Sequence, residues 1–259
     1  MELSSAQIAL WLTAWFWPFL RISALISVAP IFGNRLIPTR IRLGLAVVLT
    51  LVIAPVLPSA PWLDPVSGPG LLMAAQQVLI GATLGLALRL VFAVLEVGGQ
   101  LIAHMMGLGF AVLVDPQNGA DVPVISRLYV VFATLVFLGL NGHLAMIEVL
   151  SDSFVTLPLA SSALGQAELW GLVTHAGWIF SAALRMALPA IVALFIVNLA
   201  FGVMARAAPQ LNIFVVGFPL TLIFGFFVIL LTLPSTLPQF ESLFDVSIAT
   251  ARRLVAGGD

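Results

Sequence analysis

Six long apolar stretches, separated by short polar joints, dominate the pattern of this sequence. They run over about Ile8–Phe32, Leu43–Leu57, Leu71–Val114, Val124–Leu150, Leu172–Ala205 and Leu211–Leu233. Inside lipid the backbone must satisfy its own hydrogen bonds, so such runs are expected to be helical. A helix that spans a membrane takes roughly 20 apolar residues. The pattern therefore predicts an all-α, polytopic membrane protein with about six long helices arranged as hairpins.

The joints between these stretches hold nine of the 16 prolines and nine of the 21 charged residues. They are a basic turn at 33–42, a proline-rich loop at 58–70, an acidic turn at 115–123, a mildly acidic loop at 151–168 and a tight hairpin at 206–210. Proline interrupts a regular helix, so the loop at 58–70 is expected to be irregular. After Pro238 comes a short amphipathic tail with Arg252 and Arg253, which we predict to be helical.

Arginines in short loops indicate which end of each helix faces the cytoplasm. The turn at 33–42 holds three of them and is expected inside the cell, with the N-terminus and the proline-rich loop outside. Six simple crossings would then place the acidic turn at 115–123 inside and the arginines of the tail outside. Both placements contradict the rule. Either one stretch does not cross simply, or the chain is not part of an ordinary bilayer bundle.

Composition narrows the class of protein further. Hydrophobic residues make up 61% of the 259 residues and charged residues 8%, with a mean hydropathy of +1.17. Soluble domains carry about 25% charged residues, so this chain needs lipid or apolar partner chains around it. A net charge of −1 offers no basic surface for nucleic acid. The absence of cysteine excludes disulfides and thiolate ligands. The N-terminus lacks the basic region of a signal peptide, so we expect the first helix to be retained.

A polar stripe lies in the third stretch, which at about 65 Å is too long for one simple crossing of about 30 Å of hydrocarbon. Arg89, Glu96, Gln100 and His104 are spaced by seven, four and four residues, which stacks them on one helical face. Charges inside a membrane are costly, so this face should meet protein or water. One interpretation is that the stripe lines a pathway or binds a subunit. The alternative is that an Arg–Glu pair holds two helices together. His104 fits a packing role better than a proton relay.

Glycine and methionine are concentrated at the end of the same stretch. Glycine frees the backbone and methionine is a compliant apolar filler. We predict that this segment forms a deformable plug that closes a pore; its residues are Met105, Met106, Gly107, Leu108, Gly109, Phe110 and Asp115. Ordinary helix packing is the alternative, and it suits Gly81 and Gly85 well.

The hairpin around 206–212 is the third feature, with Arg206, Pro209, Gln210 and Asn212 as its candidate residues. Pro209 sharpens the turn, and Arg206 suits the end of a helix, where the dipole favours a cation. A plain solvated turn explains most of this pattern. No hydrolase, nucleotide or dinucleotide motif is present, and the three histidines lack ligand spacing. We therefore predict no enzyme, no cofactor and no metal.

Several groups of residues, taken in order over nearly the whole chain, carry a family resemblance. They are Arg21…Pro30-Ile31-Phe32-Gly33…Pro38…Arg40-Ile41-Arg42, then Glu96-Val97-Gly98-Gly99-Gln100 with Gly107, Gly109 and Asp115-Pro116, then Ser153-Phe154…Leu157-Pro158, and finally Arg206-Ala207-Ala208-Pro209-Gln210-Leu211-Asn212-Ile213-Phe214…Gly217-Phe218-Pro219. The last group is the most specific. Together they resemble the FliR family of the flagellar type III export gate. The SctT family of virulence secretion systems is related, but overall likeness favours the flagellar family.

The resemblance implies an architecture and partners. A FliP-like part at 1–180, including the plug, would be fused near Ser181 to a FliQ-like hairpin and tail at 181–259. The subunit would join FliP and FliQ copies in a ring, with FlhB packing near the hairpin at 206–212 and FlhA nearby. The gate would sit in the bacterial inner membrane within the flagellar basal body, partly raised toward the periplasm. Unfolded flagellar proteins would be its substrates, driven by the proton gradient and a cytoplasmic ATPase.

Two other functions remain open at this stage. A secondary transporter for a small solute needs broken helices and polar groups at mid-membrane, which Arg89, Glu96 and His104 would supply. No inverted repeat that would favour this function is visible in the sequence. A purely structural scaffold for other membrane chains is the third candidate.

Overall fold

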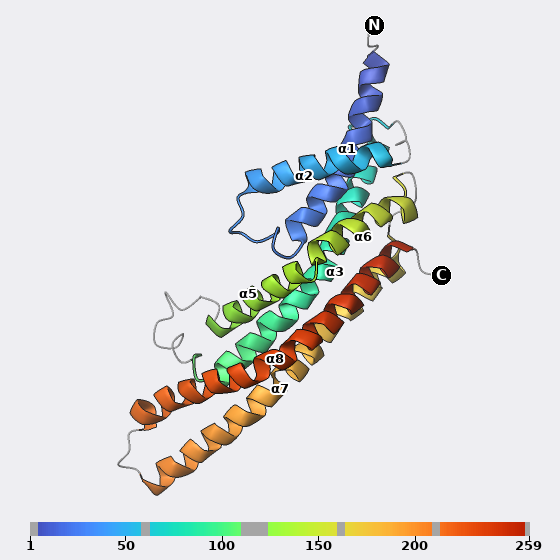
Figure 1. The fold of residues 1–259 in the computed structure, drawn as a ribbon. Coiled ribbons are helices and arrows are strands. Elements are labelled where there is room, and N and C mark those ends of the chain that lie inside the picture. The colour runs from blue at the N-terminus through green and yellow to red at the C-terminus, as the bar shows by residue number, and fades with distance from the viewer. Residues whose placement is uncertain (1–4, 58–62, 110–123, 160–163, 209–212, 257–259) are drawn as a thin grey trace. The chain divides into compact units, whose positions relative to one another are not determined.

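The structure is a computed structural model that describes residues 5–57, 63–109, 124–159, 164–208 and 213–256. Its elements are α1 (Ser5–Val28), α2 (Thr39–Ile53), the 3₁₀ turn η1 (Ala54–Val56), α3 (Gly68–Met105), α5 (Val124–Gly139), α6 (Gly142–Thr156), α7 (Gln166–Ala207) and α8 (Ile213–Ala256) (Figure 1). Within the described ranges every regular element is helical, which confirms the predicted all-α fold.

Among the described residues, four helical stretches are long and apolar enough to cross a membrane. They are Thr39–Val56, Gly68–Met105, Gln166–Ala207 and Gly217–Val255. A fifth candidate arises if α5 and α6 together form one broken span. The apolar part of α1, Thr13–Val28, is shorter. Each of the six predicted stretches thus contains helix, and the chain has the character of a polytopic membrane protein.

The structure moves two of the predicted boundaries. The fourth stretch is not one helix, because Asn141 adopts a left-handed conformation with φ of 56° between α5 and α6. Asparagine is one of the few side chains that tolerate this conformation. The predicted loop at 151–168 begins later than expected, because α6 continues to Thr156. The described part of that loop is therefore shorter than the sequence suggested.

The structure also corrects the prediction that the tail after Pro238 is a separate element. The tail is helical, as predicted, but it is the continuation of α8, a helix of 44 residues that runs through Pro219, Pro234 and Pro238. Prolines are tolerated in membrane helices where hydroxyl side chains bind carbonyls that lack a partner. Pro234 and Pro238 leave the carbonyls of Leu230 and Pro234 without an N–H donor. The hydroxyls of Ser235 and Thr236 donate to a different carbonyl, that of Thr232, and α8 continues through both prolines.

The described chain divides into two compact units. Unit 1 contains residues 1–90, 140–176 and 244–259, and unit 2 contains 91–139 and 177–243. The helices α3, α7 and α8 each contribute to both units. The predicted division at 181 separates two parts of the sequence by the proteins that they resemble, and it does not refer to compact units. Ser181 lies inside α7, so no break in the helix marks that position.

A buried arginine forms the polar centre of unit 1. Arg21 on α1 is fully buried, and its Nε donates to Oε1 of Gln77 on α3 at 2.8 Å. Its other nitrogens donate to the carbonyl of Ser153 at 2.7 Å, to the hydroxyl of Ser153 at 3.1 Å and to the carbonyl of Leu157 at 2.9 Å. The guanidinium carbon lies 4.3 Å from the ring centroid of Phe154. We call these five residues the Arg21 cluster; it joins α1, α3 and the end of α6.

Glycines let α3 approach α1 closely in the same unit. A Cβ atom at Gly81 would collide with the backbone carbonyl of Arg21. A Cβ atom at Gly85 would lie 2.8 Å from the carbonyl oxygen of Leu25. Small residues at helix interfaces allow this kind of close packing in membranes. The packing role that the sequence suggested for these two glycines is what the structure shows.

Candidate functional site

The predicted plug segment begins where α3 ends, in unit 2. Gly107 adopts a left-handed conformation with φ of 81°. Its N–H donates to the carbonyl of His104 at 3.0 Å, and the N–H of Leu108 donates to that of Ala103 at 3.1 Å. These two bonds around a left-handed glycine make a Schellman motif, which ends a helix. The chain thus leaves helical geometry at a glycine of the predicted plug segment.

All of the last four carbonyls of α3 accept hydrogen bonds. Two of them belong to the Schellman motif, and the carbonyl of Ile102 accepts from the N–H of Met106 at 3.0 Å. The carbonyl of Met105 accepts from Nδ2 of Asn198 on α7 at 2.9 Å. Helix ends normally leave four carbonyls that need water or another partner. This helix end is satisfied without water.

Methionine fills the space beneath the cap. Met106 is fully buried, and its side chain packs against Gly225 on α8. A Cβ atom at Gly225 would lie 2.5 Å from both Cγ and Cε of Met106. Nearer the start of α3, the methyl group of Met186 on α7 fills the space beside Gly98. These contacts are apolar and involve flexible side chains, so they can rearrange at low cost.

The polar stripe keeps its four positions on α3, but its members differ in environment. Arg89 and His104 are exposed in the single chain, whereas Glu96 and Gln100 are half-buried. Neither Arg89 nor Glu96 has an ion-pair partner among the described residues. His104 does meet the plug segment, because a Cβ atom at Gly109 would lie 2.8 Å from its Nδ1. The structure therefore brings one end of the stripe to the plug.

Several predicted site residues fall outside the described ranges. They are Phe110 and Asp115 of the plug, and Pro209, Gln210 and Asn212 of the hairpin. Arg206 is described; it is exposed and lies in the last turn of α7, where the helix dipole favours a cation.

Sequence reasoning missed the residues that hold the described site in place. Asn198 lies within an apolar stretch, where a lone amide is a signal that the side chain has a hydrogen-bond partner. Gly225 gave no separate signal among 21 glycines. Arg21 was visible as an arginine inside an apolar run, and the cluster around it could have been sought on that ground.

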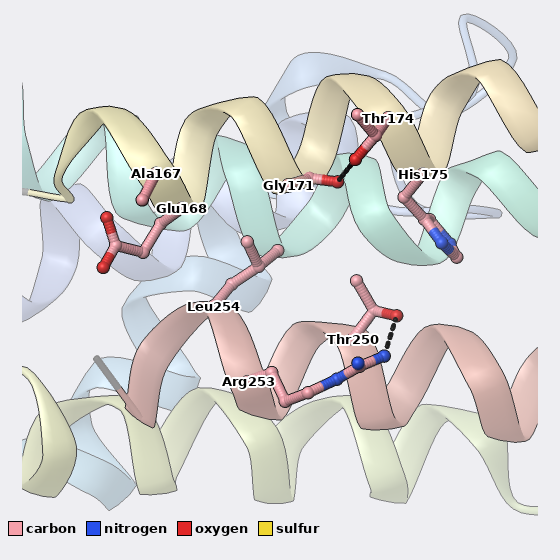
Figure 2. A pocket seen from close by; sticks show the side chains of 8 residues that line it. All are labelled: Ala167, Glu168, Gly171, Thr174, His175, Thr250, Arg253 and Leu254. Carbon is pink, nitrogen blue, oxygen red and sulfur yellow. Dashed lines mark hydrogen bonds between the residues drawn. The ribbon is translucent and has the colours of Figure 1, made fainter. Parts of the chain in front are cut away.

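A hollow of about 440 Å³, lined by both polar and apolar groups, lies between the start of α7 and the end of α8, both within unit 1. Figure 2 shows its lining, which comprises Ala167, Glu168, Gly171, Thr174, His175, Thr250, Arg253 and Leu254. Arg253 turns back to donate to the hydroxyl of Thr250 at 3.2 Å. Nε2 of His175 lies 3.3 Å from the hydroxyl of Ser247.

The charges around this hollow have a structural explanation. Glu168 lies in the first turn of α7 and Arg253 in the last turn of α8, where each suits the helix dipole. Nearby, Arg252 and Glu148 form an exposed ion pair at 2.8 Å. Within the described ranges, histidine and carboxylate side chains nowhere gather into a group of three that would hold a metal ion. We therefore assign no ligand to the hollow.

Comparison with known proteins identifies the chain's relatives. Residues 12–247 match the family described as "Bacterial export proteins, family 1". Over 236 residues the chain is 45% identical to the flagellar biosynthetic protein FliR of Pectobacterium carotovorum subsp. carotovorum, covering 91% of this chain and 90% of the relative. It is 42% identical to the FliR of Escherichia coli K12 over 245 residues, 95% of this chain and 94% of the relative.

A third relative has a lower sequence identity. The FliR of Bacillus subtilis is 31% identical over 241 residues, which cover 92% of this chain and 93% of the relative. The match therefore includes both units and the helix end described above. The chain belongs to the FliR family of bacterial export proteins.

Proposed function

We propose that this chain is a structural and gating subunit of the flagellar protein export gate. Its relatives are named flagellar biosynthetic proteins, and its long apolar helices fit a component embedded in a membrane. The observation that carries the gating role is the end of α3. There the helix ends at a glycine cap beside a buried methionine, and the predicted plug segment follows. The last four carbonyls of the helix accept hydrogen bonds from the protein and do not require water.

The plug segment fits the chemistry of a gate for polypeptides. A seal against ions must be apolar and tightly packed, yet it must yield to a chain of variable side chains. Apolar contacts of methionine and freedom of glycine meet both demands, because neither relies on directional bonds. The Met106–Gly225 contact is of this kind. Energy for transport would come from the proton gradient and a cytoplasmic ATPase, not from this subunit.

The proposed setting is a ring of FliP and FliQ copies in the inner membrane of the flagellar basal body. The described faces of α7 and α8 support partner contacts, because large apolar side chains such as Phe180, Phe195, Phe226 and Leu230 are more than half exposed in the single chain. Residues 181–259 would be the FliQ-like part and 1–180 the FliP-like part. A position raised toward the periplasm would reconcile the acidic turn and the basic tail with the charge rule.

The hairpin around Arg206 would face the cytoplasmic entrance, close to FlhB and FlhA. Arg206 is exposed at the end of α7 and is available to a partner there. Incoming flagellar proteins would pass this end before they reach the plug.

Deleting Gly107–Phe110 tests the gating role. We expect the deletion to increase ion conductance of cells or vesicles that contain the assembled gate, because the apolar seal is removed. Co-purification of FliP and FliQ with the variant shows that assembly is intact. Arg185→Gln, at an exposed position on α7 to which no role is assigned, serves as the control and should leave conductance unchanged. An assembled deletion variant with normal conductance defeats the plug assignment.

The transporter and scaffold alternatives make different predictions. Arg89 and His104 are exposed in the single chain, and the hollow between α7 and α8 is lined by other residues. Transport of a small solute by the purified chain alone would support the transporter. Variants of the plug that assemble normally but alter export or conductance would argue against a pure scaffold.

A further inference from the structure

One face of α2 is apolar and uncovered. The buried residues of the helix, Ala46, Thr50 and Ile53, lie on the side that packs against α1. The other side presents Leu43, Val47, Val48, Leu51 and Val52, each with about half or more of its surface exposed. Only 17% of the stretch Thr39–Val56 is buried. We call these five residues the outer face of α2.

Two exposed arginines lie at the start of this face. Arg35 and Arg40 are exposed and have no hydrogen-bond or ion-pair partner among the described residues. Arg42 is different, because it donates to the carbonyls of Ile37 at 2.9 Å and Asn34 at 3.3 Å. The sequence from 33 to 57 contains no acidic residue. The positive charge at this end is therefore uncompensated within the described part of the turn and helix.

The length of this apolar stretch matches the hydrocarbon thickness of a bilayer. Eighteen residues rise by about 27 Å, close to the roughly 30 Å of hydrocarbon in a bilayer. Leu36 and Ile41 flank the arginines and are 87% and 62% exposed. Apolar groups beside arginines suit the boundary between acyl chains and headgroups, where arginine extends its charge to the interface.

A protein partner explains this face less well. Helix interfaces in membranes use pairs of small residues spaced by four, or polar side chains that bond across the contact. Gly44 is exposed on α2, but the positions four residues away are Arg40 and Val48. The outer face of α2 has no polar side chain. A partner protein would also have to supply a negative charge for each free arginine.

We propose that the outer face of α2 binds anionic phospholipid, with acyl chains along Val48 and Val52 and phosphate groups at Arg35 and Arg40. This inference rests on the membrane location of the chain and is independent of the plug. Each basic residue near an anionic surface favours binding, so two of them predict a preference of roughly tenfold or more over zwitterionic lipid. High salt should reduce the preference by screening.

The chain contains no cysteine, so a single introduced cysteine can carry a fluorophore without further changes. A label at Leu36→Cys in the assembled complex would be quenched by phosphatidylglycerol or phosphatidylcholine that bears a nitroxide near the glycerol. We expect phosphatidylglycerol to quench at roughly tenfold lower mole fraction. Arg35→Gln with Arg40→Gln should abolish the difference, whereas the exposed Arg185→Gln, as the matched control, should retain it.

A second label position separates lipid from protein cover. A fluorophore at Val48→Cys should be quenched by both lipids when the nitroxide is placed deep in the acyl chain. Protection of this position from both lipids would show that a protein covers the face and would overturn the proposal. Equal quenching of the Leu36→Cys label by the two lipids would also overturn it. Neither result would change the conductance of the plug deletion, so the two proposals fail separately.

Discussion

The Arg21 cluster and the end of α3 hold helices together by opposite means. In the Arg21 cluster, a buried guanidinium makes four hydrogen bonds of 2.7–3.1 Å to two other segments. At the end of α3, the described contacts between helices are the amide of Asn198 and the apolar packing of Met106 against Gly225. The first region is fixed by directional bonds, and the second mainly by shape.

The difference separates a fixed part from an adaptable part of one chain. A hydrogen bond in an apolar environment is lost when its geometry changes, so the Arg21 cluster resists rearrangement. Contacts of methionine survive a change in geometry, because the side chain has several rotamers of similar energy. A gate needs both properties, a frame that keeps its place and a seal that gives way.

Removing Arg21 should produce the largest effect. Arg21→Ala leaves the carbonyl of Leu157 and the amide of Gln77 without this donor and opens a cavity, at a cost of about 3 kcal/mol or more. Thermal unfolding in detergent, followed by circular dichroism, should show a clear loss of stability or no folded chain. Arg21→Lys should be intermediate, because an ammonium group lacks the planar fork. An Arg21→Ala variant as stable as the exposed control Arg185→Ala would contradict the fixed frame.

A matched pair of glycine substitutions compares the two regions directly. Gly81→Ala places a methyl group against the backbone of α1, which cannot move alone, and should cost about 1–3 kcal/mol. At Gly225→Ala the three atoms nearest to the new methyl group all belong to the side chain of Met106, so this variant should cost less than Gly81→Ala. The same unfolding measurement ranks the two variants. Equal costs, or a larger cost at Gly225, would show that the methionine packing is not adaptable.

The smallest expected effect is at the cap of α3. Gly107→Ala forces a side chain into the left-handed conformation and should destabilise the helix end by about 1 kcal/mol. Gly107→Asn should cost less, because asparagine tolerates this conformation. Hydrogen exchange of the amides of Gly107 and Leu108 would measure the opening of the cap. Identical exchange in the glycine, asparagine and alanine forms would rule out a role for the cap.

The helices were predictable from the sequence because their signal is local. Long apolar runs must form backbone hydrogen bonds within themselves, which requires no knowledge of neighbours. The predicted plug segment includes Gly107, at which α3 ends, but the sequence alone did not assign the helix end to that residue. The course of α8 through Pro238 was not predictable in this way, because the effect of a proline depends on nearby hydroxyls and on packing.

The hydrogen-bond partners of polar groups within the apolar stretches could not be predicted from a local pattern. Gln77 and Ser153 lie 56 and 132 residues from Arg21 along the chain, and Asn198 lies 93 residues from Met105. Each contact depends on how helices cross, and the spacing of residues within one helix carries no information on this. For the same reason, the spacing of the polar stripe predicted that Arg89 and Glu96 share a helix face, but it did not predict which groups they contact.

The hydrogen-bonded carbonyls at the end of α3 bear on how the proposed gate, which would pass polypeptides, could still block protons. Protons move through proteins along files of hydrogen-bonded water, and buried water collects where polar groups lack partners. A helix terminus with open carbonyls beside the pore would seed such a file. In the proposed gate, each of the last four carbonyls of α3 accepts a hydrogen bond from the protein, so this terminus would give water fewer sites at which such a file could start.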